Sequence, residues 1–223
     1  MLFRRLSRRT LAAAAAVAAV PMAAAAVQPV SIASAQPCPD VEVVFARGTS
    51  EPPGIGRVGQ ALADTLRNQL GGRTVGTYGV SYPATYDFFG SGDGAIDATN
   101  RISAMAAQCP NTRIVLGGYS QGAAVVDMLA GVPPLGDRIG DVGLAPPLPG
   151  ALHGNVVAVA VFGNPSAKFG SPVSTRGSFA GKALDLCADG DPICSPGRNP
   201  FAHTSYERSP LIVQAASFAA GRI

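Results

Sequence analysis

A serine flanked by glycines is the first feature of this chain whose type and spacing could do chemistry. Residues 118–122 read Gly-Tyr-Ser-Gln-Gly, a G-x-S-x-G pentapeptide centred on Ser120. The apolar run at residues 114–116 predicts a strand before it, and residues 123–126 predict a helix after it. A strand, a sharp turn and a helix expose such a serine at the edge of a sheet, where it can attack an acyl group. Ser120 is therefore the candidate nucleophile, and an idle serine in a glycine-rich turn is the alternative.

A general base must accompany Ser120, because a free serine hydroxyl is a poor nucleophile at neutral pH. The usual chain order around this motif is serine, acid, histidine, and the two histidines of the chain both follow the serine. His153 comes just before the apolar run at residues 156–162, which puts it at the amino edge of a parallel sheet. His203 comes in a loop after the last predicted strand, at the edge where the serine lies. We therefore favour His203 as the base.

Three aspartates near the loop at residues 187–194 are candidates for the acid that orients the base: Asp185, Asp189 and Asp191. Such an acid fixes the tautomer of the imidazole and stabilises its protonated form. A disulfide across this loop would hold one carboxylate in place. Aspartates that only cap backbone amides in a turn are the alternative. Residue types and spacing alone leave Asp189 and Asp191 unranked.

Two donors to an oxyanion are expected near the nucleophile. One is the backbone amide of the residue that follows it, here Gln121, and the other comes from the loop after an early strand. Residues 46–51, Ala-Arg-Gly-Thr-Ser-Glu, follow the first predicted strand. Their small side chains would let the backbone approach a substrate, and Thr49 would add a hydroxyl. The alternative is an ordinary strand–helix turn with Arg47 and Glu51 as an exposed ion pair.

Runs that favour strands alternate with runs that favour helices along the chain. This pattern predicts a parallel sheet covered by helices on both faces. The expected fold class is α/β, a small three-layer α/β/α domain at residues 36–223 with about five parallel strands. The Pro- and Gly-rich stretch at 131–150 is expected as a surface loop. Predicted strands lie at 41–45, 74–80, 112–116, 156–162 and 179–186, and predicted helices at 56–70, 95–108, 123–129 and 211–223.

The four cysteines, all beyond residue 35, are Cys38, Cys109, Cys187 and Cys194. An even number of cysteines in an exported chain favours two disulfides. Local pairing of Cys187 with Cys194 leaves Cys38 for Cys109. The spacing fits no zinc pattern and histidines are few, so we expect neither a metal site nor a cofactor.

The first 35 residues have the composition of a secretory signal peptide. Four arginines within the first nine residues precede an apolar, alanine-rich run, and the small-x-small pattern Ala33-Ser34-Ala35 follows it. We expect cleavage after Ala35, a secreted product and no membrane span in that product; an uncleaved anchor is the alternative. The pair Arg8-Arg9 leaves twin-arginine export and general export both open.

The formal net charge of +3 depends on those four arginines. They belong to the 17 basic residues of the chain, so cleavage would leave 13 of them against 14 acidic residues. A slightly negative product gives no reason to expect binding to nucleic acid or to an anionic membrane surface.

Together these segments resemble the cutinase family, and most closely the cutinase-like esterases of mycobacteria and related actinomycetes, which have an α/β-hydrolase fold. The matching segments lie at 44–49, 111–123, 187–194 and 203–206. The resemblance implies that Asp191 is the acid and His203 the base. It implies that Thr49 and the amide of Gln121 hold the oxyanion. It also implies the two disulfides given above and a site without a large lid.

The resemblance implies that the protein is a secreted serine esterase. Such an enzyme hydrolyses short- to medium-chain acyl esters, and polyesters, through an acyl-enzyme. A lipase, phospholipase or thioesterase acting on envelope lipids, or an acetylxylan-type esterase, is the enzymatic alternative. A non-catalytic secreted binding protein is the alternative from another class. We expect a monomer whose partner is an ester or lipid substrate. Aromatic side chains from two loops are expected at the substrate rim, either exposed or packed inward: Tyr86, Phe88, Phe89 and Phe201.

Overall fold

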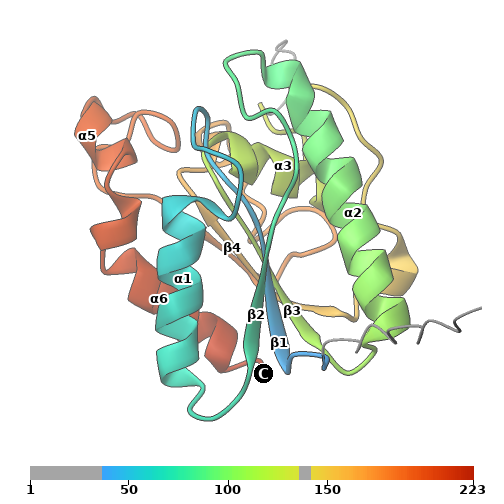
Figure 1. The fold of residues 1–223 in the computed structure, drawn as a ribbon. Coiled ribbons are helices and arrows are strands. Elements are labelled where there is room, and N and C mark those ends of the chain that lie inside the picture. Colours follow the sequence, from blue (N-terminus) through green and yellow to red (C-terminus); the bar gives the residue numbers. More distant parts are fainter. Residues whose placement is uncertain (1–36, 136–141) are drawn as a thin grey trace, which may run out of the picture. The chain divides into compact units, whose positions relative to one another are not determined.

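Parallel strands form one sheet in the order β2-β1-β3-β4-β5 (Figure 1). The computed structural model describes residues 37–135 and 142–223, so the expected signal peptide at 1–35 lies outside the described residues. Because the strands are parallel, their carboxyl ends lie at one edge of the sheet, the upper edge in Figure 1. The strands are β1 (Val41–Ala46), β2 (Val75–Gly79), β3 (Arg113–Tyr119), β4 (Val156–Phe162) and β5 (Ala183–Leu186).

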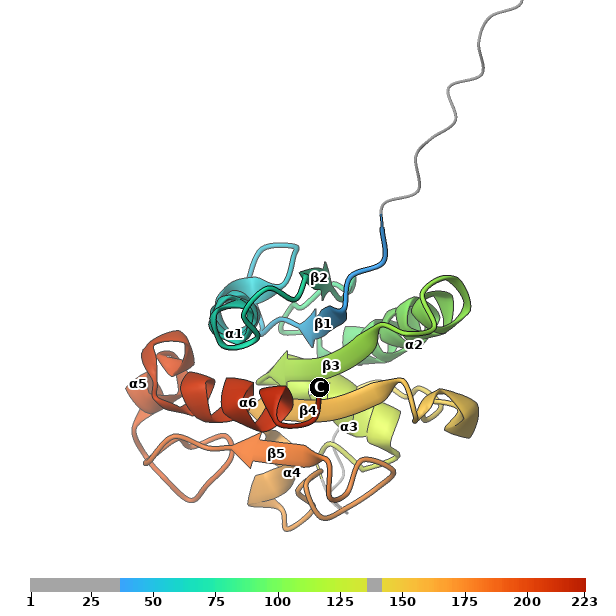
Figure 2. The same ribbon diagram turned by 90° about the horizontal axis from the view of Figure 1, so that it is seen from below.

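Helices cover both faces of this sheet (Figure 2). Helices α1 (Gly56–Gln69) and α6 (Leu211–Ala220) pack against each other on one face, and α2 (Ser91–Gln108) and α3 (Gln121–Ala130) on the other. The three layers confirm the predicted α/β class and the predicted five-stranded parallel sheet. Within the described ranges, no helix is both long enough and apolar enough to cross a membrane. Short helical turns lie in the loops: α4 (Pro165–Lys168), α5 (Pro200–His203), η1 (Phe88–Gly90), η2 (Gly150–Leu152) and η3 (Tyr206–Arg208).

Each strand supplies side chains to two apolar cores, one on each face of the sheet. In β1, Val43 and Phe45 pack in the core beneath α1 and α6, whereas Val44 and Ala46 pack beneath α2 and α3. All four side chains are at most 1% exposed. A parallel sheet that is covered on both faces needs long apolar runs, which is why β4 is apolar throughout and β1 is apolar except for Glu42.

Two element boundaries differ from the sequence prediction. Helix α2 begins at Ser91 rather than at residue 95, because its glycine-rich first turn has low helix propensity but packs closely; a Cβ at Gly92 would lie 2.8 Å from the carbonyl oxygen of Leu144. Strand β5 begins at Ala183 rather than at residue 179, because Gly181 has a φ of 80°, which no strand residue adopts. The other predicted elements agree to within a few residues at their ends.

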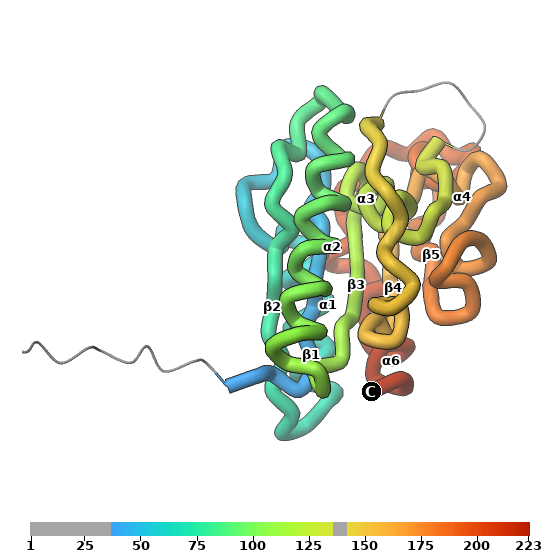
Figure 3. The backbone as a smooth tube through the Cα atoms, turned by 90° about the vertical axis from the view of Figure 1, so that its right-hand side faces the viewer, coloured from blue at the N-terminus to red at the C-terminus, as the bar shows by residue number. Residues whose placement is uncertain are grey.

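Two disulfides join Cys38 to Cys109 and Cys187 to Cys194, which is the pairing that the sequence predicts. The first joins the segment before β1 to the residue that follows α2, at the amino edge of the sheet. The second closes the loop that follows β5, at the carboxyl edge. Figure 3 shows from the side that α4 lies near this carboxyl edge, while the C-terminal end of the chain lies near the amino edge.

Candidate active site

Ser120 lies at the tight turn between β3 and α3, with a backbone φ of 56° and a ψ of −115°. A positive φ is strained for a residue that carries a side chain. The turn leaves no room for side chains at the flanking glycines. A Cβ at Gly118 would lie 2.1 Å from the carbonyl oxygen of Gly122, and a Cβ at Gly122 would lie 1.9 Å from that of Ala46. Both glycines of the pentapeptide are therefore required by the close approach of β1, β3 and α3.

His203 lies between Ser120 and Asp191. Its Nε2 is 2.8 Å from Oγ of Ser120, and its Nδ1 is 2.8 Å from Oδ2 of Asp191. His203 is the last residue of α5, and Asp191 belongs to the loop that follows β5, so both come from loops at the carboxyl edge. In this geometry the imidazole can accept the serine proton at Nε2 while Nδ1–H donates to the carboxylate.

The carboxylate of Asp191 is fully buried and is surrounded by hydrogen-bond donors. Besides His203, the amide of Ile193 donates to Oδ1 at 2.7 Å, and the hydroxyl of Tyr206 donates to Oδ2 at 2.6 Å. Burial opposes the ionisation of Asp191, but these donors outweigh it and hold the pKa of Asp191 below the ordinary value of an aspartate. The carboxylate is therefore ionised at neutral pH, as an acid that orients an imidazole must be.

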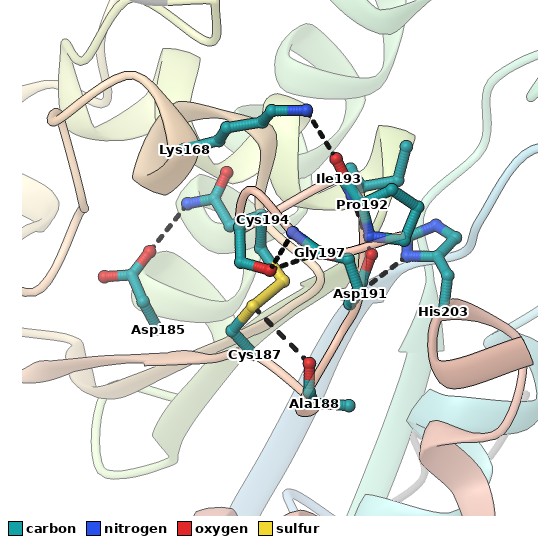
Figure 4. Close-up of a disulfide and its surroundings, with 12 residues drawn as sticks. Lys168, Asp185, Cys187, Ala188, Asp191, Pro192, Ile193, Cys194, Gly197 and His203 are labelled. Atoms are coloured by element: carbon teal, nitrogen blue, oxygen red, sulfur yellow. Dashed lines mark hydrogen bonds and ion pairs between the residues drawn. A yellow bond between two sulfur atoms is a disulfide. The ribbon is translucent and has the colours of Figure 1, made fainter. Parts of the chain in front are cut away.

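The Cys187–Cys194 disulfide supports the loop that carries Asp191 (Figure 4). Sγ of Cys194 lies 3.5 Å from the hydroxyl oxygen of Tyr206, and this oxygen also accepts from the amide of Ala188 at 3.0 Å. Burial raises the pKa of Tyr206, with the neighbouring carboxylate adding to the shift, so its hydroxyl keeps its proton and remains a donor. In Figure 4 the side chain of Asp191 extends from this loop toward His203.

The two other candidate aspartates have different surroundings. Asp189 is exposed in a turn. Asp185 accepts from the side chain of Asn164 at 2.8 Å and from the amide of Ser174 at 2.8 Å, so it holds two loops together. Asp191 is thus the member of the three that the structure brings to His203.

His153 lies before β4, at the amino edge of the sheet, whereas Ser120 follows β3 at the carboxyl edge. Its Nε2 is 2.9 Å from the carbonyl oxygen of Leu148, and its ring packs edge-on against Phe179 with centroids 5.9 Å apart. These contacts give His153 a structural place far from the candidate nucleophile. Across the described residues, His, Cys, Asp and Glu side chains do not gather in a group of three or more that could hold a metal ion.

The loop between β1 and α1 brings Thr49 next to Gln121, the first residue of α3. Oγ1 of Thr49 lies 3.0 Å from Oε1 of Gln121. Glu51 fixes the same loop, because its Oε2 accepts from the amide of Gly48 at 2.7 Å. Thr49 is therefore held beside the residue that follows the candidate nucleophile, where two donors to one oxyanion are needed.

The expected alternative for this loop, an exposed ion pair between Arg47 and Glu51, is wrong. Arg47 is only 3% exposed, and burial of a guanidinium requires acceptors for its donors. These acceptors are backbone carbonyls, which tie the loop to the segment after β2: Glu51 (2.9 Å), Val80 (3.2 Å), Tyr82 (2.6 Å) and Pro83 (3.4 Å). The carboxylate of Glu51 instead pairs with Arg57, with Oε1 3.3 Å from Nε.

Aromatic side chains of the two predicted rim loops are exposed rather than packed inward. Tyr86 is 78% exposed, Phe89 59% and Phe201 79%, while Phe88 is 40% exposed. Exposed apolar groups that gather on one surface usually mark a contact with an apolar partner. These side chains therefore give the molecule an apolar surface on the loops at the carboxyl edge of the sheet.

An apolar cavity of about 370 Å³ opens beside Ser120. It reaches into the space between α3, α4 and η1, and its apolar walls come from Phe88, Ala124, Leu135, Val142, Pro165 and Ile193. A hollow of about 570 Å³ next to α1 is larger but more open, and its charged residues are held in ion pairs: Arg57 with Glu51 and Glu207, and Asp64 with Arg67. The smaller cavity is the one with a reactive side chain at its mouth.

Comparison with known proteins identifies the family. The sequence profile of the cutinase family matches residues 37–223. The chain belongs to the cutinase family. Phospholipase Culp4 of Mycobacterium tuberculosis is 50% identical over 187 residues, which cover 83% of this chain and 80% of the relative. Carboxylesterase Culp1 of the same species is 45% identical over 199 residues, 86% of this chain and 85% of the relative.

Solved structures agree with this assignment. A cutinase of Trichoderma reesei in complex with a phosphonate inhibitor is 37% identical, with a TM-score of 0.64 over 83% of this chain and 77% of the other. The predicted resemblance is therefore confirmed, and this member of the cutinase family is a cutinase-like serine ester hydrolase.

Several residues that support the site of this cutinase-family enzyme give no signal in the sequence. Gly163, with a φ of 59°, follows β4; a Cβ there would lie 2.7 Å from Cε1 of His203 and 3.1 Å from Oδ2 of Asp191. Tyr119 donates its hydroxyl to the carbonyl oxygen of His203 at 2.6 Å. Tyr206 lies within the segment that resembles the family, but only its contact with Asp191 shows what it does.

Proposed function

We propose that this enzyme cleaves carboxylic esters through an acyl-enzyme on Ser120, with His203 as general base and Asp191 as the acid that orients it. The observation that carries the proposal is the continuous line of hydrogen bonds from Ser120 through both nitrogens of His203 to Asp191, each 2.8 Å long. A serine in such a line can transfer its proton to the imidazole as it attacks.

The reaction begins when Oγ of Ser120 attacks the ester carbonyl carbon and its proton passes to Nε2 of His203. The carbonyl oxygen becomes an oxyanion, which the amide of Gln121 and the hydroxyl of Thr49 stabilise. The intermediate then collapses: the bond to the alcohol breaks, His203 gives its proton to the leaving alcohol, and the acyl group stays on Ser120. Water repeats these steps on the acyl-enzyme, releases the carboxylic acid and returns the proton to Ser120.

The acyl part of the substrate is proposed to occupy the apolar cavity beside Ser120. A cavity of about 370 Å³ suits short- to medium-chain acyl groups. We propose that the alcohol part, including that of a polyester chain, lies toward the exposed aromatic side chains of the rim loops. Carboxylic esters of this length are therefore the substrates that we propose first.

Hydrolysis of phospholipids or other envelope lipids is the second candidate. The observation that favours it is the exposed aromatic rim, where Tyr86 and Phe201 can enter an apolar surface. A relative with 50% identity is also named a phospholipase. A lipid surface and a soluble ester would then reach the same Ser120.

We also propose that the enzyme is secreted and acts as a monomer. Structural disulfides form and persist in oxidising compartments outside the cytosol, and the two disulfides of this protein fit such a location together with the expected signal peptide. Fractionation of cells that express the full chain tests secretion, and size-exclusion chromatography of the product tests the monomer.

Labelling with a fluorophosphonate probe tests the nucleophile. We expect one adduct, on Ser120, and we expect Ser120→Ala to lose the adduct and to lower kcat by about 10⁴-fold or more while the fold persists. Ser217→Ala is a matched control, because Ser217 is exposed on α6 and its hydroxyl only contacts Gln69. Ester hydrolysis that survives in Ser120→Ala would overturn the assignment. A folded wild-type protein without adduct would favour a binding protein on this fold.

A series of p-nitrophenyl esters from acetyl to palmitoyl, compared with phospholipid vesicles, separates the two substrate classes. We expect kcat/KM to be highest for short- to medium-chain esters and to fall for palmitate. A maximum at palmitate, or faster release of fatty acid from vesicles than from soluble esters, would favour the lipid substrate.

A further inference from the structure

Three polar side chains from separate elements form a chain of hydrogen bonds behind the proposed oxyanion donors. Nε2 of Gln121 lies 3.1 Å from Oγ of Ser91, and Oε1 of Gln121 lies 3.0 Å from Oγ1 of Thr49. Ser91, the first residue of α2, is fully buried, and Gln121 is 5% exposed. We call the side chains of Thr49, Gln121 and Ser91 the relay. Burial keeps water from replacing the hydrogen bond between Gln121 and Ser91, whereas Thr49 is only partly buried and faces the site.

The number of hydrogens in the relay limits what Thr49 can do. A threonine hydroxyl carries one hydrogen, which it donates to one acceptor at a time. When Oε1 of Gln121 faces Thr49, that hydrogen goes to the carboxamide and is withheld from an oxyanion. The hydroxyl oxygen of Thr49 would then lie near the oxyanion, but its hydrogen would point at Gln121 and could not stabilise the oxyanion.

Rotation of the carboxamide of Gln121 by a half-turn about its last side-chain bond removes this conflict. The rotation exchanges the oxygen and the nitrogen at almost the same positions. Nε2 then donates to Oγ1 of Thr49, and the hydroxyl of Ser91 donates to Oε1. Gln121 and Ser91 remain partners in both orientations, so no buried group loses its hydrogen bond. The hydrogen of Thr49 becomes free to point at the oxyanion.

We propose that the side chain of Gln121, held by Ser91, is a positioning group that turns the hydroxyl of Thr49 toward the oxyanion. This inference deepens the proposed function and rests on it, because it takes Thr49 as an oxyanion donor. Gln121 then serves both donors: its backbone amide binds the oxyanion directly, and its side chain acts through Thr49. A donor that is oriented before the reaction stabilises the transition state more than one that must reorient.

Substitution of Gln121 by glutamate tests the direction of the hydrogen bonds. Gln121→Glu keeps the shape of the side chain, but an ionised carboxylate only accepts, so it holds the hydrogen of Thr49 and that of Ser91. We expect kcat to fall about 100-fold or more, the loss that follows removal of one oxyanion donor, with KM little changed. Gln121→Met keeps the length without donating or accepting, and should lower kcat only about tenfold, or ~1.4 kcal/mol.

A double-mutant cycle with Thr49 separates positioning from packing. Thr49→Ala should lower kcat about 100-fold, because one donor is lost. In that background Gln121→Met and Ser91→Ala should have no further effect on kcat, because no hydroxyl is left to orient. Thr49→Ser restores a hydroxyl and should restore the sensitivity of kcat to Gln121→Met. Gln214→Met, on the exposed side of α6, is the matched control and should leave kcat unchanged.

The outcomes distinguish failure of the relay from failure of the proposed function. If Gln121→Met lowers kcat by the same factor with and without the Thr49 hydroxyl, the two effects are independent. That result would overturn the relay but leave the proposed ester hydrolysis intact. An unchanged kcat in Thr49→Ala would overturn the oxyanion role of Thr49 and the relay with it. Thermal unfolding of each variant monitors the fold, and if Gln121→Met does not fold, Ser91→Ala completes the same cycle.

Discussion

Tyr206 donates its hydroxyl hydrogen to Oδ2 of Asp191 at 2.6 Å, and this is the same oxygen that lies 2.8 Å from Nδ1 of His203. The side chain of Tyr206 is 1% exposed and is held in turn by the amide of Ala188. Tyr206 therefore holds the carboxylate oxygen that contacts the imidazole. We regard it as a positioning residue for the proposed base.

Tyr206→Phe should lower kcat/KM about tenfold, which corresponds to ~1.4 kcal/mol of transition-state energy. It should also destabilise the protein by roughly 1.5–3 kcal/mol, the usual value of a hydrogen bond to a charged group. Steady-state kinetics and thermal unfolding measure the two effects. Tyr78 lies in β2 and also donates its hydroxyl to a carboxylate, that of Asp97, but it does not contact the proposed catalytic residues. Tyr78→Phe is therefore the matched control. It should lose stability and keep its kcat/KM; an equal loss of activity in both variants would contradict the positioning role.

The pH dependence of the Tyr206→Phe destabilisation follows from the lowered pKa of Asp191. A carboxyl whose folded pKa is depressed contributes stability above the unfolded pKa, about 3.9, and loses it as the pH falls through the folded value. Removal of the Tyr206 donor raises the folded pKa of Asp191. The difference in unfolding free energy between wild type and variant should therefore be largest at neutral pH and shrink as the pH falls through the folded pKa of Asp191, first in the variant and then in the wild type. A difference that stays constant with pH would show that the lost stability has another source.

Gly163→Ala should lower kcat strongly, because its Cβ would lie 2.7 Å from Cε1 of His203 and would push the imidazole away from Ser120. Gly170→Ala is the matched control. Gly170 also has a positive φ, 77°, but a Cβ there meets nothing within 4 Å. Both variants should lose about 1–2 kcal/mol of stability from backbone strain, and only Gly163→Ala should lose activity. Equal kcat values in the two folded variants would refute the steric argument.

Asp127→Asn should make the protein more stable at neutral pH. Asp127 is fully buried in α3, where Asn164 donates to it at 3.0 Å, and burial raises the pKa of Asp127 well above its ordinary value. A raised folded pKa means that stability is fully present below the unfolded pKa and falls as the pH rises from about 4 toward the folded pKa. Asparagine resembles the neutral acid and removes this fall.

Unfolding free energies of Asp127→Asn and wild type at pH 4 and pH 8 measure the effect. The gain from the substitution should be larger at pH 8. Asp64→Asn, at an exposed carboxylate on α1, is the control and should change the pH slope by little. If the unfolding free energy of Asp127→Asn changes with pH as steeply as that of the wild type, another group is responsible for the pH dependence.

Removal of the two disulfides should separate stability from activity. The Cys38–Cys109 bridge spans 71 residues and the Cys187–Cys194 bridge spans 7. Loop-closure entropy gives about 4 kcal/mol for the first and about 2 kcal/mol for the second. Paired substitutions to alanine should therefore lower the melting temperature more at Cys38 and Cys109. The double substitution at Cys187 and Cys194 should lower kcat more than the one at Cys38 and Cys109, because the Cys187–Cys194 bridge supports Asp191. A larger loss of kcat in the Cys38 and Cys109 variant would be evidence against that support.

Most of the fold could be predicted from the sequence because it depends on local patterns. Continuous apolar runs predict buried parallel strands, and residues 156–162 were predicted with the observed bounds of β4. The start of α2 could not be predicted, since a first turn of serine, aspartate and two glycines has no helical signal and forms only because it packs against neighbouring segments. Tertiary packing thus decided the boundaries that local propensity left open.

The sequence by itself determined the turn around Ser120, the order of serine, acid and histidine, and the pairing of the cysteines, because each depends on residue types and on position along one chain. Only the tertiary structure decided what these residues contact. In the tertiary structure Arg47 is buried and donates to backbone carbonyls, and Thr49 contacts Gln121, which lies 72 residues further along the chain. Gly163 lies next to the side chain of His203. The physical reason is that such contacts join loops at the carboxyl ends of different strands, and the distance between two loops depends on the packing of the whole sheet rather than on the residues within either loop.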